Sequence, residues 1–456
     1  MKNLVYTAGM AFLVSVLSAN EVVPVEEMSS DAAIVQEKDT DTVLQEYLDS
    51  RPNGGWKEGV NHNKNGIFVV EKGIGAIQGK PDSVSYNDSR SRAFDKAMMD
   101  AKAKLAEFLE NEISMAASYS YVEPPIGGST AERELAETIA NQPSDSIIGK
   151  AKMLVSKKLD NLLRKEGYDV DAAKAGGKAR EAELKAKIAA VQGKETFQKV
   201  IKSCSSTVLS GAQAFYTVAI VKGGRAEIGV ILVWSPKLAE MASSLVNGRS
   251  VSRTTPKKPI KEQINKDPDT LLTAFGVQQK IDENGEYVLV AFGQAAARSS
   301  NSASANMART KARQNAQAMI RSFAGETIAH NMAQEQAEET LDFGEGTVPD
   351  YRDQSSAERI IKAASAKMSI NGLGSVYSWN TRHPISGRLV YGTVVSWNPS
   401  QADIAREVKK QIESSAKDGA AGRRTVPSMT VSPVNKPTPT ATERVKVVNQ
   451  GDADAF

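Results

Sequence analysis

The feature that most constrains this sequence is an internal repeat centred on an alanine-rich segment. Two stretches of the chain place alanines, and then larger apolar residues, at identical spacing. The first stretch contains Ala93, Ala97, Ala101, Ala103, Leu105, Phe108 and Ile113, and the second contains Ala308, Ala312, Ala316, Ala318, Ile320, Phe323 and Ile328. Because alanine at every fourth position lines one face of a helix, each stretch predicts a helix that packs closely on a sheet.

The repeat extends to both sides of the helix. Segments 65–70 and 284–290 begin a strand before each helix, and each copy ends in a hairpin that closes on a tryptophan, Trp234 or Trp397. A polar residue and a proline follow each tryptophan, which is typical of a helix start. The predicted fold class is therefore α+β: two tandem copies of a β-α-(helical insert)-β-β-α module, in which small antiparallel sheets have helices packed on one face.

The rest of the chain is organised around these copies. We predict module 1 at residues 66–247, with a long helical insert at about 129–203, and module 2 at 271–413. The remaining segments are predicted to be an extended arm at 20–65 with one short helix near Val43 to Leu48, a linker at 248–270, and a disordered Pro/Thr-rich tail at 414–456. The insert is rich in Ala, Lys, Glu and Leu with apolar residues at helical spacing, so it predicts two or three helices.

The first 19 residues are typical of a secretory signal peptide. Lys2 precedes an apolar run at 4–17, and small residues follow it. We expect cleavage after Ala19. An uncleaved anchor helix is the alternative, although the run is shorter than the roughly 20 residues that span a bilayer. No later segment is apolar enough to span, so the expected location is periplasmic or secreted.

Composition argues against several classes of protein. The 57 basic and 54 acidic residues nearly cancel, whereas nucleic-acid binders carry a basic face. Cys204 is the single cysteine, which excludes an intrachain disulfide and a cysteine-based zinc site. His62, His330 and His383 are scattered without ligand spacing. We therefore predict no metal site, no cofactor and no nucleic-acid partner.

Motifs of catalysis are weak. The glycines at 73–79 follow a strand with the spacing G-x-G-x-x-x-G, one residue longer than a dinucleotide loop, and a bulge or tight bend is the preferred interpretation. No nucleophile elbow or phosphate loop occurs, and acidic pairs such as Glu338-Glu339 lie in polar runs. Trp234 and Trp397 are expected to pack rather than to stack on a ligand. We predict no catalytic residues and no enzyme, and the sequence does not specify ligand-binding residues.

The glycine stretch, the segment Ala93–Ala106 and the late hairpin resemble a group of bacterial envelope modules. These modules occur in small surface lipoproteins and in the N-terminal region of the T-ring protein of sodium-driven polar flagella. The resemblance covers each strand–helix segment and, more loosely, each hairpin. It implies a helix packed on a small sheet, a location in the cell envelope and a role in assemblies rather than in catalysis.

The expected function is that of an exported, non-catalytic structural or assembly protein of the bacterial cell envelope, which binds other protein subunits or self-associates. Two modules on a linker can engage two sites and gain avidity. The alternative is a periplasmic small-ligand or glycan-binding protein that uses a groove between sheet and helices. An enzyme of unrecognised type is the third hypothesis.

Overall fold

The computed structural model describes residues 34–398 except 37, 52–53, 64–65, 81–82, 84, 120, 122–128, 175–180, 223–224, 248–254, 341–342, 344–346 and 367–371. The chain divides into two compact units, Met1–Arg406 and Glu407–Phe456, and all the described residues belong to the first. The predicted signal peptide, the Pro/Thr-rich tail and the closing helix expected after Trp397 lie outside the described residues. None of the described helices combines the length and the apolar character needed to cross a membrane.

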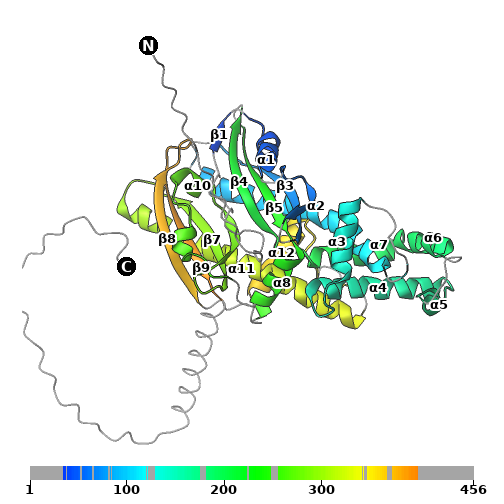
Figure 1. Cartoon of the computed structure of the whole chain (residues 1–456). Helices are drawn as coiled ribbons and strands as arrows, with labels where there is room; N and C mark the ends of the chain where they lie inside the picture. Colours follow the sequence, from blue (N-terminus) through cyan, green and yellow to red (C-terminus); the bar gives the residue numbers. More distant parts are fainter. Residues whose placement is uncertain are drawn as a thin grey trace, which may run out of the picture. The chain divides into compact units, whose positions relative to one another are not determined.

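Module 1 is built on a five-stranded sheet in the order β1-β4-β5-β3-β2 (Figure 1). Strand β1 pairs in parallel with β4, and the other pairs are antiparallel. The strands are β1 (Ile34–Gln36), β2 (Gly59–Asn63), β3 (Gly66–Ala76), β4 (Gln213–Lys222) and β5 (Arg225–Trp234).

Module 2 repeats this connectivity in a four-stranded antiparallel sheet of order β6-β7-β9-β8. The strands are β6 (Gly276–Ile281), β7 (Tyr287–Ala296), β8 (Leu373–Arg382) and β9 (Leu389–Trp397). A register shift follows Ala214 in β4 and Ser375 in β8, at matching positions after Gly211 and Gly372. Both glycines have a positive φ, 82° and 81°, so the copies share even this local irregularity. The predicted α+β class with two similar modules is confirmed.

One long helix lies on each sheet, α2 (Tyr86–Ser118) on the first and α11 (Ser302–Thr340) on the second. The helices approach the strands so closely that a Cβ on Gly73 would lie 2.0 Å from the Ala97 carbonyl oxygen, and one on Gly293 would lie 2.1 Å from that of Ala312. The alanine stripe therefore packs inside each module. Gly73 and Gly75 serve this contact, whereas Gly79, with a φ of 95°, lies at a bend after the strand, in line with the tight bend that the sequence suggested.

The modules are larger than the sequence indicated. Each begins with an extra strand, β2 or β6, that completes a hairpin before the long helix. The predicted arm includes β1, β2 and helix α1 (Thr40–Asp49), which confirms the short helix near Val43 to Leu48 but not an extended arm. The predicted linker includes α9 (Ile260–Gln263) and the start of α10 (Pro268–Thr273).

Helices also cover the second face of each sheet, which is a correction to the expected one-sided packing. In module 1, Leu44 and Leu48 of α1 share a buried cluster with Phe68 and Val70 of β3. In module 2, residues of α9 and α10 pack in the same way on β7. The strands at the centre of each sheet are therefore buried on both faces, which explains why β4 and β5 read as nearly continuous apolar runs, whereas the edge strand β8 is partly exposed.

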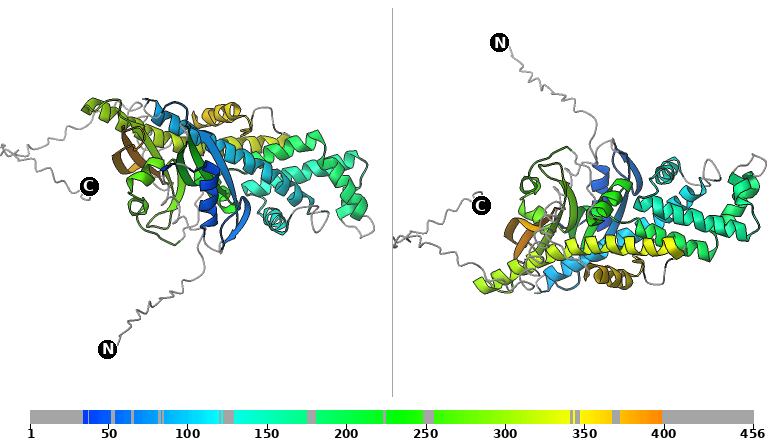
Figure 2. Two further views of the ribbon diagram at one scale, coloured as in Figure 1. Left: turned by 90° about the horizontal axis from the view of Figure 1, so that it is seen from above. Right: turned by 90° about the horizontal axis from the view of Figure 1, so that it is seen from below.

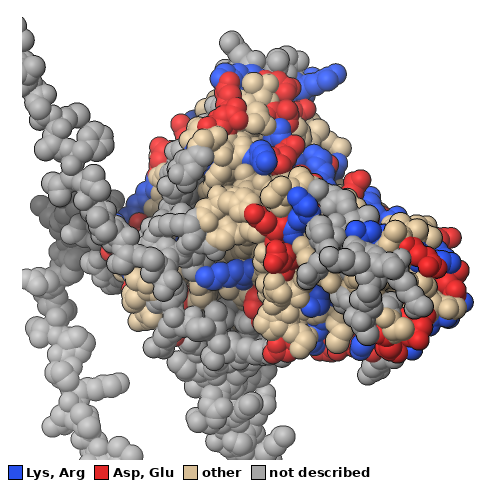
Figure 3. All heavy atoms as spheres, turned by 45° about the vertical axis from the view of Figure 1, so that its right-hand side comes forward, with Lys and Arg blue, Asp and Glu red and all other residues tan. Residues whose placement is uncertain are grey.

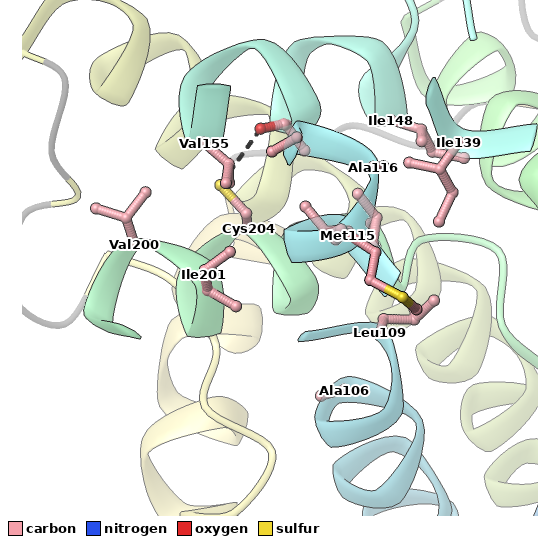
Figure 4. Close-up of a cluster of buried hydrophobic side chains, with 14 of the residues drawn as sticks. Ala106, Leu109, Met115, Ala116, Ile139, Ile148, Val155, Val200, Ile201 and Cys204 are labelled. Atoms are coloured by element: carbon pink, nitrogen blue, oxygen red, sulfur yellow. Dashed lines mark hydrogen bonds between the residues drawn. The ribbon is translucent and has the colours of Figure 1, made fainter. Parts of the chain in front are cut away.

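The insert of module 1 is helical, as predicted, and forms its own core with the end of α2 (Figure 4). Its helices are α3 (Thr130–Ala140), α4 (Ile147–Lys165), α5 (Val170–Lys174), α6 (Glu181–Gln192) and α7 (Glu195–Thr207). Cys204 is buried there with its thiol 3.7 Å from the Ala151 carbonyl oxygen, and burial raises the pKa of this thiol. Helix α8 (Pro236–Asn247) follows β5, and α12 (Gln354–Ala366) is the shorter counterpart of the insert in module 2.

The two equivalent tryptophans are buried, as expected from their corner positions. Trp234 donates a hydrogen bond of 2.8 Å from its indole nitrogen to the Val208 carbonyl oxygen, and Trp397 belongs to the core between β9 and α11. Neither side chain is presented for stacking on a sugar or a peptide.

Candidate functional site

The two modules are packed against each other along a contact that we call the seam. Helices α2 and α11 run side by side in the same direction along the seam (Figure 2). Two ion pairs join them: Lys311 Nζ lies 2.8 Å from Asp88 Oδ1, and Lys102 Nζ lies 2.6 Å from Glu326 Oε1. The edges of β4 and β6 also meet, where the Gln279 backbone N–H donates to the Gln213 side chain at 2.8 Å. The modules therefore form one unit, which corrects the expectation of separate modules held by a linker.

A cleft of about 860 Å³ opens along the seam. Helices α2 and α11 form its long walls, the ends of β4 and β6 line its base, and α12 contributes a third wall. The ion pair Asp88–Lys311 spans it at one end and the pair Lys102–Glu326 at the other. The stretch of α2 between Asp88 and Lys102 is about 20 Å long at 1.5 Å per residue, so the cleft is elongated.

The apolar part of the cleft consists mainly of flexible side chains. They are Met98 and Met99 on α2, Met319 on α11, and the rings of Phe94 and Phe323. Methionine adapts its shape to different partners because it is unbranched and polarisable. This lining favours a ligand with apolar groups rather than a small, purely polar solute.

Charged side chains of both signs line the cleft: the acids are Asp88, Asp95, Glu326 and Glu358, and the bases are Arg92, Lys96, Lys102 and Lys311. Asp95 on α2 forms no ion pair with any described residue, and Glu358 on α12 accepts a hydrogen bond only from Gln354, at 2.8 Å. Desolvation against the cleft walls and the nearby charge of Glu358 raise the pKa of Asp95 to about 6. At neutral pH Asp95 is therefore ionised.

A buried polar network closes the inner end of the cleft. Lys102 donates to both carboxylate oxygens of Glu326, at 2.6 and 2.7 Å, and Tyr351 also donates to this carboxylate. Burial opposes ionisation of Glu326, but the charge of Lys102 and the hydrogen bonds from Lys102 and Tyr351 outweigh it and hold the pKa of Glu326 below its usual value. The end wall is thus a fixed ion pair that joins the modules.

His330 connects this network to module 1. Its Nε2 lies 3.0 Å from the Tyr351 hydroxyl, and its Nδ1 lies 2.9 Å from the Ser210 hydroxyl. Burial lowers the pKa of His330 to about 4, so the ring is neutral. The Tyr351 hydroxyl donates its hydrogen bond to Glu326, so it accepts from His330. The ring therefore carries its proton on Nε2, donates from there to Tyr351, and accepts from the Ser210 hydroxyl at Nδ1. Ser210 and His330 are fully buried outside the cleft, so this pair does not present a nucleophile to a ligand.

The other histidines lie apart from this network. His62 is half-exposed, 3.3 Å from Glu134, and His383 is buried at the turn between β8 and β9. The three histidines are therefore as scattered in space as in sequence. The described residues contain no group of three side chains suited to hold a metal ion.

On the face drawn in Figure 3, acidic and basic side chains are interspersed over the helical insert. The described residues of this face form no continuous basic stripe of the kind that tracks a nucleic-acid backbone. This distribution agrees with the near balance of charges in the sequence.

The comparisons with known proteins give a match to one domain model and a distant similarity to a solved structure. A domain of unknown function, DUF6844, matches residues 144–247, which run from the insert through β4 and β5 to α8. No curated protein matches the chain. Among solved structures, a hypothetical protein from Francisella tularensis is similar, with 18% identity and a TM-score of 0.47 over 82% of this chain and 96% of the other.

The sequence did not reveal the cleft. Its walls come from polar positions of α2 and α11 that, in sequence, resemble solvated helix faces. The one available signal was that Met98 and Met99, which lie between two alanines of the stripe in sequence, are apolar residues outside the stripe itself.

Proposed function

We propose that the chain is an exported, non-catalytic binding protein of the bacterial cell envelope, and that the seam cleft holds a segment of another protein subunit. The observation that carries this proposal is the elongated cleft formed jointly by the two modules. Export is supported by the signal-like pattern of residues 1–19.

The dimensions of the cleft favour a chain segment. About 20 Å of helix wall matches roughly six residues of an extended chain at about 3.3 Å each. Methionine-rich walls with a polar rim are typical of surfaces that receive apolar side chains of a partner protein. Both long walls belong to helices that are fixed on sheets, so the groove is present before a partner arrives.

The charges of the cleft indicate what the segment carries. Asp95 and Glu358 lie near each other; Lys102 and Lys311 are engaged by Glu326 and Asp88, Arg92 donates to the Ser89 hydroxyl, and Lys96 also lines the cleft. A lysine or arginine between the two free carboxylates would relieve their repulsion. The proposed partner segment is therefore apolar with one basic residue.

A small ligand or glycan is the second candidate. The volume of the cleft falls within the range of about 300–1,000 Å³ that is typical of ligand sites. Asn315 and Ser322 line it and carry amide and hydroxyl groups of the kind that bind sugars.

Co-purification from envelope fractions separates these candidates. A tagged full-length chain should retain a defined protein partner, and Met99→Glu should reduce its recovery at least tenfold, because a charge would enter the apolar wall. The matched control is Met307→Glu, on a side chain that is 66% exposed outside the cleft. Equal recovery with both variants, with circular dichroism confirming that both fold, would reject the cleft as the protein-binding site. A chain that retains no protein but melts at a higher temperature with one sugar or small molecule would favour the second candidate.

A further inference from the structure

The guanidinium of Arg90 is buried at the seam without a carboxylate beside it. Arg90 lies in the second turn of α2 and is 1% exposed. It donates to the Leu272 carbonyl oxygen, to Gln294 at 3.3 Å and to Asn87 at 3.4 Å, all of which are neutral. Burial lowers the pKa of Arg90 to about 10, so it remains a cation at neutral pH. A buried charge is strongly unfavourable unless an opposite charge compensates it.

Three buried nitrogen atoms in this region have no hydrogen-bond partner among the described residues: Arg90 Nε, Asn87 Nδ2 and His383 Nε2. All three are donors. His383 Nδ1 accepts from the backbone N–H groups of Ile385, at 3.2 Å, and Ser386, at 3.3 Å, so the ring proton lies on Nε2. Asn87 is 7% exposed and His383 is 1% exposed, so water from the bulk does not reach these donors freely.

The donors come from both modules and meet at the start of α2. The His383 ring contacts the Tyr86 ring edge-on, with centroids 5.6 Å apart, and Tyr86 directly precedes Asn87. Arg90 in turn donates to the Asn87 side chain at 3.4 Å, so these contacts link the four side chains. They also lie at the positive end of a helix of 33 residues, where an anion is favoured.

We infer that a small monovalent anion of the chloride class binds between Arg90, Asn87 and His383 and joins the two modules. The net charge of the surrounding side chains decides which class of anion can bind. Burial, and then the charge of Arg90, lower the pKa of His383 to about 3, so this ring is neutral and Arg90 supplies the single positive charge. The nearest acid along the helix, Asp88, is engaged by Lys311. A water molecule would satisfy the donors but not the charge, and a dianion would leave a negative charge buried.

Bromide, which replaces chloride and scatters anomalously, tests the site directly. Crystals of the wild-type chain grown in sodium bromide should show an anomalous peak within hydrogen-bond distance of Arg90 Nε, Asn87 Nδ2 and His383 Nε2. An ordered water there, or bromide only on the molecular surface, would overturn the inference. This test needs no variant and so does not depend on whether a substituted chain folds.

A solution measurement gives an independent test. With gluconate holding the ionic strength constant, the melting temperature should rise with chloride by roughly 2 °C per tenfold increase above the Kd. Arg90→Met and His383→Phe should each lose this dependence. Arg90→Met should also be no less stable than wild type in chloride-free buffer, because it removes the unpaired charge. The control Arg92→Met, on an exposed neighbour, should retain the dependence. A wild-type melting temperature that does not respond to chloride would contradict the inference.

Discussion

At the scale of single residues, the sequence predicted the core better than the buried charges. Ten of the fourteen alanines and larger apolar residues of the repeat are buried, because helical spacing identifies which face of a helix meets the sheet. Spacing cannot identify a carboxylate that flanks this face and is then covered by another element. Glu112 of α2 is such a case: it is 1% exposed, and one of its carboxylate oxygens has no partner among the described residues.

The buried carboxyl group of Glu112 predicts how the stability of the chain depends on pH. Burial, and then the nearby charge of Glu132, raise the pKa of Glu112 from 4.5 to about 8. Between these values the folded chain holds a proton that the unfolded chain has released, so this residue lowers stability as the pH rises. Relative to wild type, Glu112→Gln should gain about 3–4 kcal/mol of unfolding free energy between pH 5 and pH 8, measured by denaturant titration. Glu107→Gln, on an exposed residue of the same helix, is the control. A Glu112→Gln effect that stays constant with pH would show that Glu112 is ionised in the fold.

At the scale of elements, the long helices, the insert and the hairpins that end on tryptophan were predictable because their patterns are long and regular. Strands β2 and β6 were missed for a physical reason. Strand β2 contains glycine, asparagine and histidine, and β6 contains two glutamines and a lysine, so neither shows the alternation of a half-buried strand. The helices α9 and α10 are too short for a 3.6-residue period to be recognised.

The close contact between helix and sheet predicts that the stability of each module depends on a glycine in its sheet, Gly73 in module 1 and Gly293 in module 2. Gly73→Ala and Gly293→Ala should each destabilise the chain by about 1–3 kcal/mol, because the added methyl group would push α2 or α11 away from its sheet. Gly374→Ala is the matched control, since its Cβ would meet nothing closer than 3.6 Å. Denaturant titration of the three variants is the measurement. Similar losses for all three would mean that the loss of chain flexibility, not the close contact, explains these glycines.

At the scale of the whole molecule, the sequence revealed the duplication but not how its copies meet. The seam joins residues that are far apart in sequence, and its main ion pair, Lys102–Glu326, whose members are 224 positions apart, looks in sequence like two solvated side chains. The residues that form the seam are also not part of the repeated pattern, because the two copies share their core positions and differ at their surfaces. The cleft could therefore not be predicted from either copy alone.

The seam makes a stability prediction. Lys102→Met should cost about 3–5 kcal/mol, because it leaves Glu326 buried without its cation, and adding Glu326→Met should recover part of this loss. Lys311→Met breaks the exposed pair of the seam, in which both side chains are almost half-exposed, and should cost less than about 1 kcal/mol. Unfolding free energies from denaturant titration give the comparison. Equal costs for the two lysine variants would indicate that the inner end of the seam is open to water.

The most direct test of the central claim is photo-crosslinking in cells from inside the cleft. A photoreactive amino acid at Met319, on the α11 wall, should give one defined adduct with another envelope protein. The same residue at Met332, which is 47% exposed on α11 outside the cleft, should not give this adduct. The absence of any protein adduct from position 319, or the same adduct from both positions, would contradict the claim that the cleft binds a protein segment.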